Sequence, residues 1–333
     1  MTIITDGDIK GEPLSGKTVS VFGYGNQGEA QALNLRDSGV DVLVALKEAS
    51  RSRKAARAAG FEVLDPGDAA SGADICALLV PDRIMAEFIS ETLAPVLRAG
   101  ATIVFAHGYP LRFGGAAAPE DVDVVVVAPM GPGLRLRERY VNGEGLPASF
   151  AVEQDATGRA RATALEYAKA IGCARVGLFE TTAAEETEID LFAEQAVLCG
   201  GVTRLIEAGF DTLVEAGYSP DLAYLECLYE LDLTVNLIRR FGIDGMRKRI
   251  SRTALYGDLT RGGRVIGPDV RDRMRQVLSE VRDGTFAAEM VSDEMNRGAE
   301  LERALAEQRA TLLEEVGRRL AGVAHEPPEP ESP

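Results

Sequence analysis

The chain has 333 residues, of which 36 are Lys or Arg and 52 are Asp or Glu, so its formal net charge is −16. This length suits two domains with separate cores, and the acidic balance disfavours nucleic acid and anionic membrane as partners. The N-terminus, MTIITDGDIKGEPLSG, lacks the basic start and apolar core of a signal peptide. No apolar run approaches the roughly 18 residues that a membrane span needs. We therefore expect a cytoplasmic protein.

Short β-rich runs alternate with helix-length segments from residue 17 to about residue 180. The runs are rich in Val, Ile and Ala and read KTVSVFG, DVLVAL, ADICALLV, ATIVFAHG, DVDVVVVAP and ARVGLFET. Apolar runs separated by helices indicate a parallel sheet that is covered on both faces. We therefore predict a doubly wound α/β domain over residues 1–182.

Helical periodicity replaces the strand pattern after residue 182 and continues to about residue 323. Brief breaks are expected at Gly217, Pro220, Gly242, Gly267 and Gly284. We predict an all-helical second domain over residues 183–323, whose heavy apolar content suggests a large core shared with another subunit. The Pro- and Glu-rich tail, residues 324–333, is predicted to be disordered.

The cysteines and histidines do not suggest a zinc or redox site. The cysteines stand singly in apolar segments and are predicted to be small core residues: Cys76, Cys173, Cys199 and Cys227. The two histidines are His107 and His325. Because His325 belongs to the tail, a zinc site built from histidines is not expected.

A glycine-rich turn follows the first predicted strand and opens a helical segment, QGEAQALNLRDSG. The turn consists of Gly23, Tyr24, Gly25, Asn26, Gln27 and Gly28. Glycines in this context permit a tight turn and close approach of a pyrophosphate, whose charge is met by the helix N-terminus. The alternative is a structural turn that binds nothing. We predict a dinucleotide-binding Rossmann domain.

The end of the second predicted strand bears on the choice between NADPH and NADH. Enzymes that use NAD usually place an acid there for the ribose 2′-hydroxyl, but this stretch carries hydroxyl and basic side chains, including Lys47, Ser50, Arg51 and Ser52. Such groups suit a 2′-phosphate, although an ordinary solvated basic turn would look similar and Glu48 weakens the case. NADPH is therefore preferred over NADH.

Two pairs of carboxylates lie in segments that otherwise resemble buried helix, EIDLFAEQAVLCGG and AYLECLYELDLTV. The pairs are Asp190 with Glu194 and Glu226 with Glu230. A spacing of four residues places both acids of a pair on one helix face, about 6 Å apart. Buried carboxylates must be paired or coordinate a metal, and oxygen ligands favour Mg²⁺ over Zn²⁺. We therefore predict a Mg²⁺ site, with a solvated helix face as the alternative.

The order of these motifs resembles that of the short-form ketol-acid reductoisomerases. The resemblance runs from about residue 13 to residue 323 and is carried by GYGNQGEAQALNLRDSGVDV, AHGYPLRFG, APMGPG and the segment from EETEIDLFAEQ to LYEL. It implies a Rossmann domain followed by a helical domain, interlocked in a homodimer. It also implies NADPH, two Mg²⁺ ions, and an alkyl shift followed by reduction in the synthesis of branched-chain amino acids.

The resemblance also assigns roles to individual residues. It implies that Asp190 and Glu194 bind metal on one helix, while Glu226 and Glu230 are supplied by the partner subunit. It further matches Ser251 to the family's substrate-contacting serine and His107 to its active-site histidine. Arg252, where the family has a small polar residue, is a candidate group to hold the electrophile, and Gly133 of the APMGPG motif is a candidate cofactor residue. For His107 a hydrogen-bonded core residue is the alternative, and for Ser251 the alternative is a helix cap.

Several residues depart from the family's usual motifs close to the substrate. The most consequential is Met130, which stands in APMGPG where the family has a lysine that belongs to the acid/base network of the alkyl shift. Five further departures are Glu29, Leu134, Tyr229, Arg252 and Leu255. A thioether offers neither charge nor a transferable proton, so Met130 cannot replace an ammonium group.

We therefore predict an NADPH-dependent reductase of this family that has weak or absent isomerase activity on acetolactate and acts on another substrate in specialised metabolism. The electrophile would be a C=O, C=N or activated C=C bond. One alternative is a true ketol-acid reductoisomerase in which another group replaces the lysine. A second alternative is a non-catalytic cofactor-binding protein, which would have no need to retain buried acids.

Overall fold

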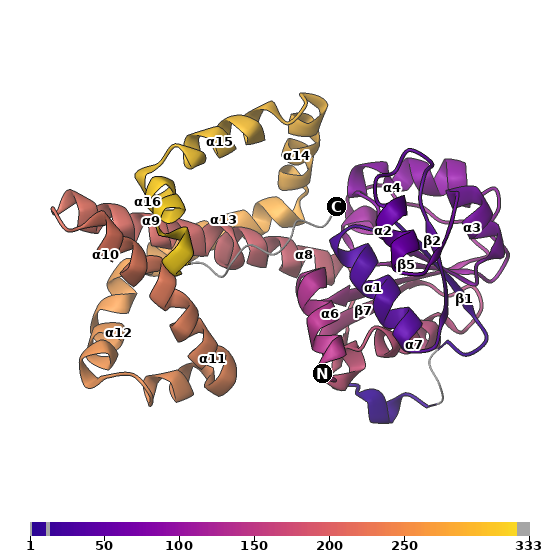
Figure 1. The fold of residues 1–333 in the computed structure, drawn as a ribbon, viewed down its shortest axis with the longest axis horizontal. Helices are drawn as coiled ribbons and strands as arrows, with labels where there is room; N and C mark the ends of the chain where they lie inside the picture. Colours follow the sequence, from indigo (N-terminus) through magenta and orange to yellow (C-terminus); the bar gives the residue numbers. More distant parts are fainter. Residues whose placement is uncertain (1, 11–13, 325–333) are drawn as a thin grey trace. The chain divides into compact units, whose positions relative to one another are not determined.

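A computed structural model describes residues 2–10 and 14–324 and divides the chain into two compact units, between Ile189 and Asp190. The first unit contains a sheet with helices, and the second is helical (Figure 1). The predicted boundary at residue 182 falls just before α8 (Ala183–Ala193), whereas the observed division falls within this helix. The first turn of α8 belongs to the first unit because Ala183, Glu186 and Thr187 are buried there.

The first unit is built on one sheet of eight strands in the order β3-β2-β1-β4-β5-β6-β7-β8. The strands are β1 (Thr18–Phe22), β2 (Asp41–Ala45), β3 (Glu62–Leu64), β4 (Ile75–Leu78), β5 (Thr102–Phe105), β6 (Asp123–Pro129), β7 (Ala148–Gln154) and β8 (Leu178–Glu180). All neighbouring strands are parallel except β6 and β7. The predicted doubly wound, mostly parallel sheet is confirmed. The prediction lacked β3 and β7.

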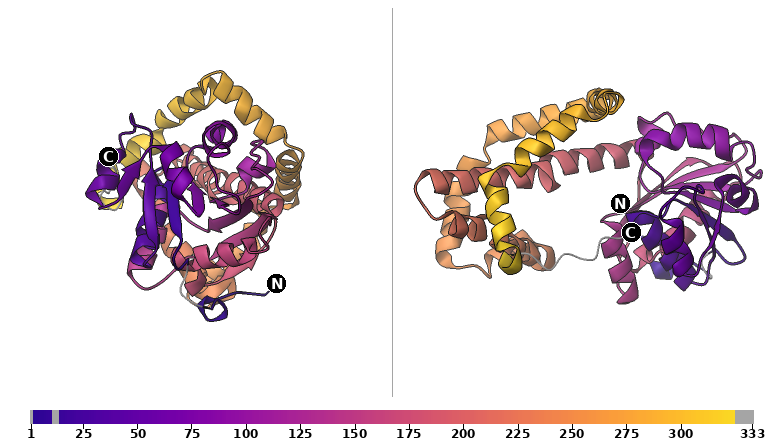
Figure 2. Two further views of the ribbon diagram at one scale, coloured as in Figure 1. Left: turned by 90° about the vertical axis from the view of Figure 1, so that its right-hand side faces the viewer. Right: turned by 45° about the horizontal axis from the view of Figure 1, so that its top comes forward.

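Helices lie on both sides of this sheet (Figures 1 and 2). They are α1 (Asn26–Asp37), α2 (Arg53–Ala58), α3 (Pro66–Gly72), α4 (Asp82–Phe88), α5 (Tyr109–Arg112), α6 (Gly133–Val141) and α7 (Ala160–Ala170), followed by α8. Strand side chains alternate between two cores: Val19 and Val21 pack with α1, α2, α6 and α7, while Phe22 and Leu78 pack with α3 and α4. This alternation is what burial of both faces of a parallel sheet requires.

The second unit contains no strand among its described residues. Its helices after α8 are α9 (Gly200–Glu215), α10 (Pro220–Tyr224), α11 (Glu230–Arg247), α12 (Arg252–Val265), α13 (Pro268–Arg282), α14 (Thr285–Met295), α15 (Ala299–Arg309) and α16 (Leu312–Ala324). The predicted breaks lie at helix ends or kinks, and Gly242 interrupts α11 with φ +70°. The predicted all-helical domain is confirmed. Residues 325–333 of the predicted tail, with His325, lie outside the described residues.

The core of the helical unit is small within the single chain. Within the described residues its buried cluster comprises Phe210, Ala223, Tyr224 and Val316, while many large apolar side chains are exposed, including Val197, Leu198 and Leu233. The single chain thus holds only a small core, because these side chains find too few partners within it. The predicted large core shared with another subunit stays a prediction.

The cysteine prediction is only half right. Cys76 and Cys173 are buried, and burial raises the pKa of each thiol to about 12. Cys227 is half-buried and Cys199 is exposed. Both belong to the helical unit, whose small core leaves them incompletely covered. No helix in the described part of the chain is long and apolar enough to cross a membrane.

Candidate active site

The glycine-rich turn connects β1 to α1, and two of its glycines are required by the fold. Gly23 has φ +103°, and a Cβ atom there would lie 2.3 Å from the Leu79 carbonyl oxygen. A Cβ atom on Gly28 would lie 2.3 Å from the Gly23 oxygen. Any side chain at either position would therefore force the backbone of the turn to move.

Gly25 differs from these two glycines. It precedes the first residue of α1 with φ −94° and ψ −159°, which other residues can adopt, and a Cβ atom there would meet nothing within 4 Å. The fold therefore does not explain this glycine. Close approach of a ligand to the N-terminus of α1, where the backbone N–H groups favour an anion, does explain it.

These two environments predict opposite results for matched substitutions. Gly25→Val should retain the fold and the melting temperature to within a few degrees, but weaken dinucleotide binding by about tenfold or more because the branched side chain occupies the ligand's space. Gly28→Val should lower the melting temperature strongly, because its added atoms meet backbone. Thermal melts and titration of cofactor fluorescence measure both effects. Normal binding by folded Gly25→Val protein would contradict the assignment.

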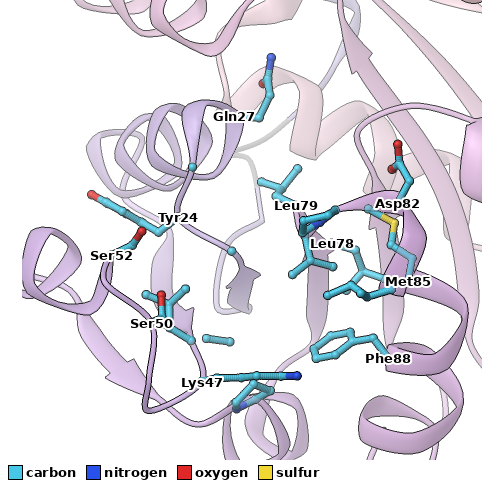
Figure 3. A pocket seen from close by; sticks show the side chains of 18 of the residues that line it. Tyr24, Gln27, Lys47, Ser50, Ser52, Leu78, Leu79, Asp82, Met85 and Phe88 are labelled. Carbon is cyan, nitrogen blue, oxygen red and sulfur yellow. The ribbon is translucent and has the colours of Figure 1, made fainter. Parts of the chain in front are cut away.

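A cavity of ≈ 690 Å³ lies beside the glycine-rich turn, within the first unit. Figure 3 shows Tyr24, Ser50 and Ser52 on one side of it and an apolar wall on the other. The wall consists of Leu78, Leu79, Met85 and Phe88. Apolar walls with a few convergent polar groups are typical of cofactor sites. Predicted cofactor residues that line the cavity are Gly23, Tyr24, Gly25, Gln27, Lys47, Ser50, Ser52 and His107.

The basic turn after β2 divides into binding and structural residues. Lys47, Ser50 and Ser52 line the cavity, and Arg51 is exposed beside them in sequence without lining it. Arg53, by contrast, is mostly buried and donates to the Asp65 carboxylate at 3.0 Å. Lys47, the two hydroxyls and exposed Arg51 thus remain as candidate groups for a phosphate.

The residues around the cavity fit a nicotinamide dinucleotide. Gly25 leaves space at the helix N-terminus, and Tyr24, which lines the cavity, is 5% exposed with a hydroxyl that has no hydrogen-bond partner in the described structure. Burial, and secondarily the charge of Glu29, raises the pKa of Tyr24 to about 12, so this hydroxyl stays protonated at neutral pH. A buried hydroxyl without a partner is costly, and this atom has almost no accessible surface.

His107 lies in the cavity just beyond the end of β5. Its Nε2 atom is 3.1 Å from Oδ1 of Asp82, and both side chains are more than one-third exposed. The Asp82 carboxylate constrains the orientation of the imidazole ring. The structure thus makes His107 a cavity residue, in contrast to the alternative of a hydrogen-bonded core residue.

The loop after β6 carries Met130 and is attached to the glycine-rich turn. Met130 is 53% exposed. Gln27 Nε2 donates to the Gly131 oxygen at 3.0 Å, and Leu134 N donates to Oδ1 of Asn26 at 3.0 Å. A Cβ atom on Gly133 would lie 2.1 Å from the Asn26 oxygen. Asn26 and Gly133, both predicted to bind cofactor, therefore join these two segments instead of lining the cavity.

Each carboxylate pair lies at a π-helical turn. Glu194 begins the turn Glu194–Leu198 directly after α8, and Glu226 lies within the turn Leu225–Tyr229, which Glu230 follows. Turns of this kind are rare in proteins as a whole, and those that occur often lie at functional sites. The insertion of an extra residue into each helix thus falls where the acids stand.

The carboxylates are not buried in the single chain. Asp190, Glu194, Glu226 and Glu230 are all exposed, so the prediction of buried acids is wrong at this level. The described residues bring together no group of three or more His, Cys, Asp or Glu side chains that could hold a metal ion. Each pair is therefore an open set of oxygen ligands that needs further ligands to complete a site.

The remaining predicted residues lie in the helical unit or close to the turn. Ser251 is the N-cap of α12, and its hydroxyl accepts a hydrogen bond from Ala254 N at 3.1 Å. The structure thus gives Ser251 the capping role that was the alternative to substrate contact. Its neighbour Arg252 is exposed, as is Tyr229. Glu29 and Leu255 are half-buried.

Sequence reasoning missed Asp82 and Glu186. Asp82 follows β4 in the segment VPD, at the carboxyl edge of the sheet where ligands bind, and that position could have indicated it. The Glu186 carboxylate is 8% exposed and accepts a hydrogen bond from Gly108 N at 2.6 Å, next to His107. The π-helical turns and the apolar wall were also missed.

Comparisons with known proteins agree over most of the chain. Residues 13–177 match a family described as acetohydroxy acid isomeroreductase, NADPH-binding domain, and residues 184–325 match ketol-acid reductoisomerase, C-terminal domain. The structure of an NADH-preferring ketol-acid reductoisomerase from an uncultured archean is 39% identical, with 97% of this chain and 99% of that chain covered and a TM-score of 0.93.

Two further structures share the fold alone. A putative oxidoreductase from Jannaschia sp. is 16% identical, with coverage of 80% of this chain and 97% of that chain and a TM-score of 0.61. A semialdehyde dehydrogenase NAD-binding protein from Cupriavidus necator is 18% identical, with coverage of 78% and 99% and a TM-score of 0.55. The chain therefore belongs to the ketol-acid reductoisomerase family and is an NAD(P)H-dependent oxidoreductase.

Proposed function

We propose that this enzyme is an NADPH-dependent reductase with weak or absent isomerase activity on acetolactate, and that it reduces a C=O, C=N or activated C=C bond of another substrate in specialised metabolism. The observation that carries the proposal is Met130. Its exposed thioether stands at the carboxyl end of β6, where the motif of the family usually has lysine.

The two halves of the family's reaction make different demands on the protein. Hydride transfer needs a bound nicotinamide and an oriented electrophile. The alkyl shift additionally needs a group that removes the hydroxyl proton. Met130 has no such capacity, while the cavity, the glycine-rich turn and His107 are present. The reductive half is therefore the better supported of the two.

Mg²⁺ is part of the proposal, held by Asp190 and Glu194 together with Glu226 and Glu230. Carboxylate oxygens are the ligands that this ion prefers. When bound, Mg²⁺ would act as a Lewis acid toward the oxygen atoms of the substrate. The paired acids would attract such a cation by their negative charge, and their exposure leaves room for the substrate beside it.

We propose a homodimer in which each active site combines the first pair of one subunit with the second pair of its partner. Two observations support it: the pairs are exposed in the single chain, and large apolar side chains such as Val197, Leu198 and Leu233 are exposed close to them in sequence. Exposed apolar residues in such numbers are typical of a protein interface. Sedimentation of the purified protein measures the state, and a monomer at active concentrations would exclude the shared site.

NADPH is the proposed cofactor, supported by Lys47, Ser50 and Ser52 at the cavity. The NADH preference of the 39% identical enzyme makes NADH the competing choice. Fluorescence titration with both cofactors separates them, and tighter binding of NADH would reverse the proposal.

The second candidate is a true ketol-acid reductoisomerase, which the 39% identity over 97% of the chain favours. Incubation with acetolactate, Mg²⁺ and NADPH separates the two. Turnover at ordinary enzyme rates, on the order of 1 s⁻¹ or faster, would establish the second candidate. Absence of Mg²⁺ binding, together with NADPH that binds but is not oxidised by any metabolite of the neighbouring pathways, would instead favour a non-catalytic cofactor-binding protein. The first candidate requires cofactor binding without such turnover.

A further inference from the structure

A chain of three hydrogen bonds runs from the core of the first unit to the loop that carries Met130. Tyr167 on α7 lies 2.8 Å from Oε1 of Gln31 on α1, and Gln31 Nε2 lies 3.1 Å from Oε1 of Gln27. Gln27 Nε2 in turn lies 3.0 Å from the Gly131 carbonyl oxygen. The chain therefore links α7, α1 and the loop between β6 and α6.

Only one direction of donation satisfies every member of this chain. A carbonyl oxygen can only accept, so Gln27 must present its NH₂ group to Gly131. Its own oxygen must then accept from the NH₂ group of Gln31, and the oxygen of Gln31 must accept from Tyr167. The hydroxyl of Tyr167 is therefore required as a donor, because a group that could only accept would leave the chain unsatisfied.

Burial strengthens this requirement. Tyr167 is fully buried and Gln31 is 1% exposed, so water cannot replace a missing partner of either one. Burial also raises the pKa of Tyr167 far above its ordinary value, and the hydroxyl keeps its proton. A buried amide that loses its partner costs more than the hydrogen bond itself contributes.

Gln27 is the member of this series of hydrogen bonds that lies at the candidate cofactor site. It lines the cavity, and Figure 3 shows it at the opposite end of the cavity from Lys47. The loop that it holds at Gly131 begins with Met130 and reaches α6 through Gly133. The hydrogen bond from the Gln27 amide to Gly131 thus connects the lining of the cavity to the loop that carries Met130.

We propose that Tyr167 and Gln31 are positioning residues, which act through Gln27 to hold the Met130–Gly133 loop against the glycine-rich turn and so set the geometry of the cofactor site. Neither of them lines the cavity. The role does not depend on the substrate, so it holds for a reductase and for a full reductoisomerase alike.

The test is Tyr167→Phe, which removes one oxygen atom from the core. We expect the dissociation constant for NADPH, measured by fluorescence at least 20 °C below the melting temperature of the variant, to rise by about threefold to tenfold. Hydrogen exchange of the Met130–Gly133 amides, measured without cofactor, should accelerate about fivefold or more. A purely structural role would lower the melting temperature and leave both readouts unchanged, which would overturn the proposal.

The matched control is Tyr140→Phe. This tyrosine also belongs to the first unit. Its hydroxyl lies 2.6 Å from the Ser38 hydroxyl and takes no part in the three hydrogen bonds described above. Tyr140→Phe should change the melting temperature without changing NADPH binding or exchange of the Met130–Gly133 amides. Equal effects of the two variants on those readouts would contradict the proposal, since the effect would then follow from losing any tyrosine hydroxyl.

Gln27→Met provides a second route because Gln27 is only half-buried and its replacement should not prevent folding. Without cofactor, this variant should accelerate exchange of the same amides. Adding Tyr167→Phe to it should cause no further acceleration, because the chain is already broken at its last link. Additive effects would show that Tyr167 does not act through Gln27.

Discussion

Asp190→Asn and Glu194→Gln should each reduce Mg²⁺-dependent turnover by about 100-fold or more. Each change removes one of the two negative charges with which its pair would attract the cation. Both side chains are exposed, so each variant should still fold.

Metal-dependent thermal melts provide a readout separate from activity. A ligand that binds only the folded state raises its stability by about 2.7 kcal/mol at 100 times its dissociation constant. The native protein should therefore melt at a higher temperature with Mg²⁺, and Asp190→Asn should not respond. Glu215→Gln, on α9 in the same unit, makes the same change of charge and should respond like the native protein. Unaltered turnover in both pair variants would remove the carboxylates from the mechanism.

Mixed variants test whether the two pairs meet across subunits. Asp190→Asn and Glu230→Gln should each be inactive alone. If each site combines one pair from each subunit, refolded mixtures should regain activity, because some sites then receive two intact pairs. Mixtures that stay inactive, despite exchange of subunits, would place all four acids of a site in one chain.

Most of the first unit could be predicted from sequence because its strands are buried on both faces. Runs such as DVVVVAP have no polar side to confuse with a surface helix. The exceptions have physical reasons. The strand Glu62–Leu64 is too short to show a pattern. The strand Ala148–Gln154 mixes polar and apolar residues and runs antiparallel to its neighbour Asp123–Pro129, so it does not follow the alternation of parallel strands and helices.

The helical unit was predictable in its secondary structure and not in its packing. Heavy apolar content around the acids indicated burial, but a sequence pattern does not distinguish a face covered within the chain from one covered by another molecule. Leu198 and Leu233 illustrate this, since both are more than half exposed. The π-helical turns were also beyond prediction, because four-residue spacing does not report the extra residue in the backbone.

The candidate cofactor site could be predicted where one segment carries the signal, as in the glycine-rich turn. It could not be predicted where distant segments meet. Asp82 reaches His107 only because β4 and β5 are neighbours in the sheet. Likewise, Asn26 and Gln27 were predicted only as cofactor residues, and the structure adds that both hold the loop that begins at Met130.

Met130→Lys should raise turnover of acetolactate by about tenfold or more. General acid–base groups commonly contribute 10²–10⁴-fold, and the five other departures from the family motifs would retain part of the loss. The site has room for the change. Met130 is 53% exposed, and its backbone is held by the hydrogen bond from Met130 N to the Pro147 oxygen at 2.9 Å. A lysine side chain can therefore follow the path of the methionine without a clash.

The control substrate for this prediction is a 2-keto acid that requires reduction alone. Because hydride transfer does not need the missing base, Met130→Lys should change the kcat for that compound less than the kcat for acetolactate, with the NADPH dissociation constant unchanged. Met130→Gln, which is polar but uncharged, should raise neither. A gain with glutamine equal to that with lysine would mean that polarity suffices. No gain with lysine would mean that Glu29, Leu134, Tyr229, Arg252 and Leu255 dominate the altered chemistry, and the search for the substrate would begin with those side chains.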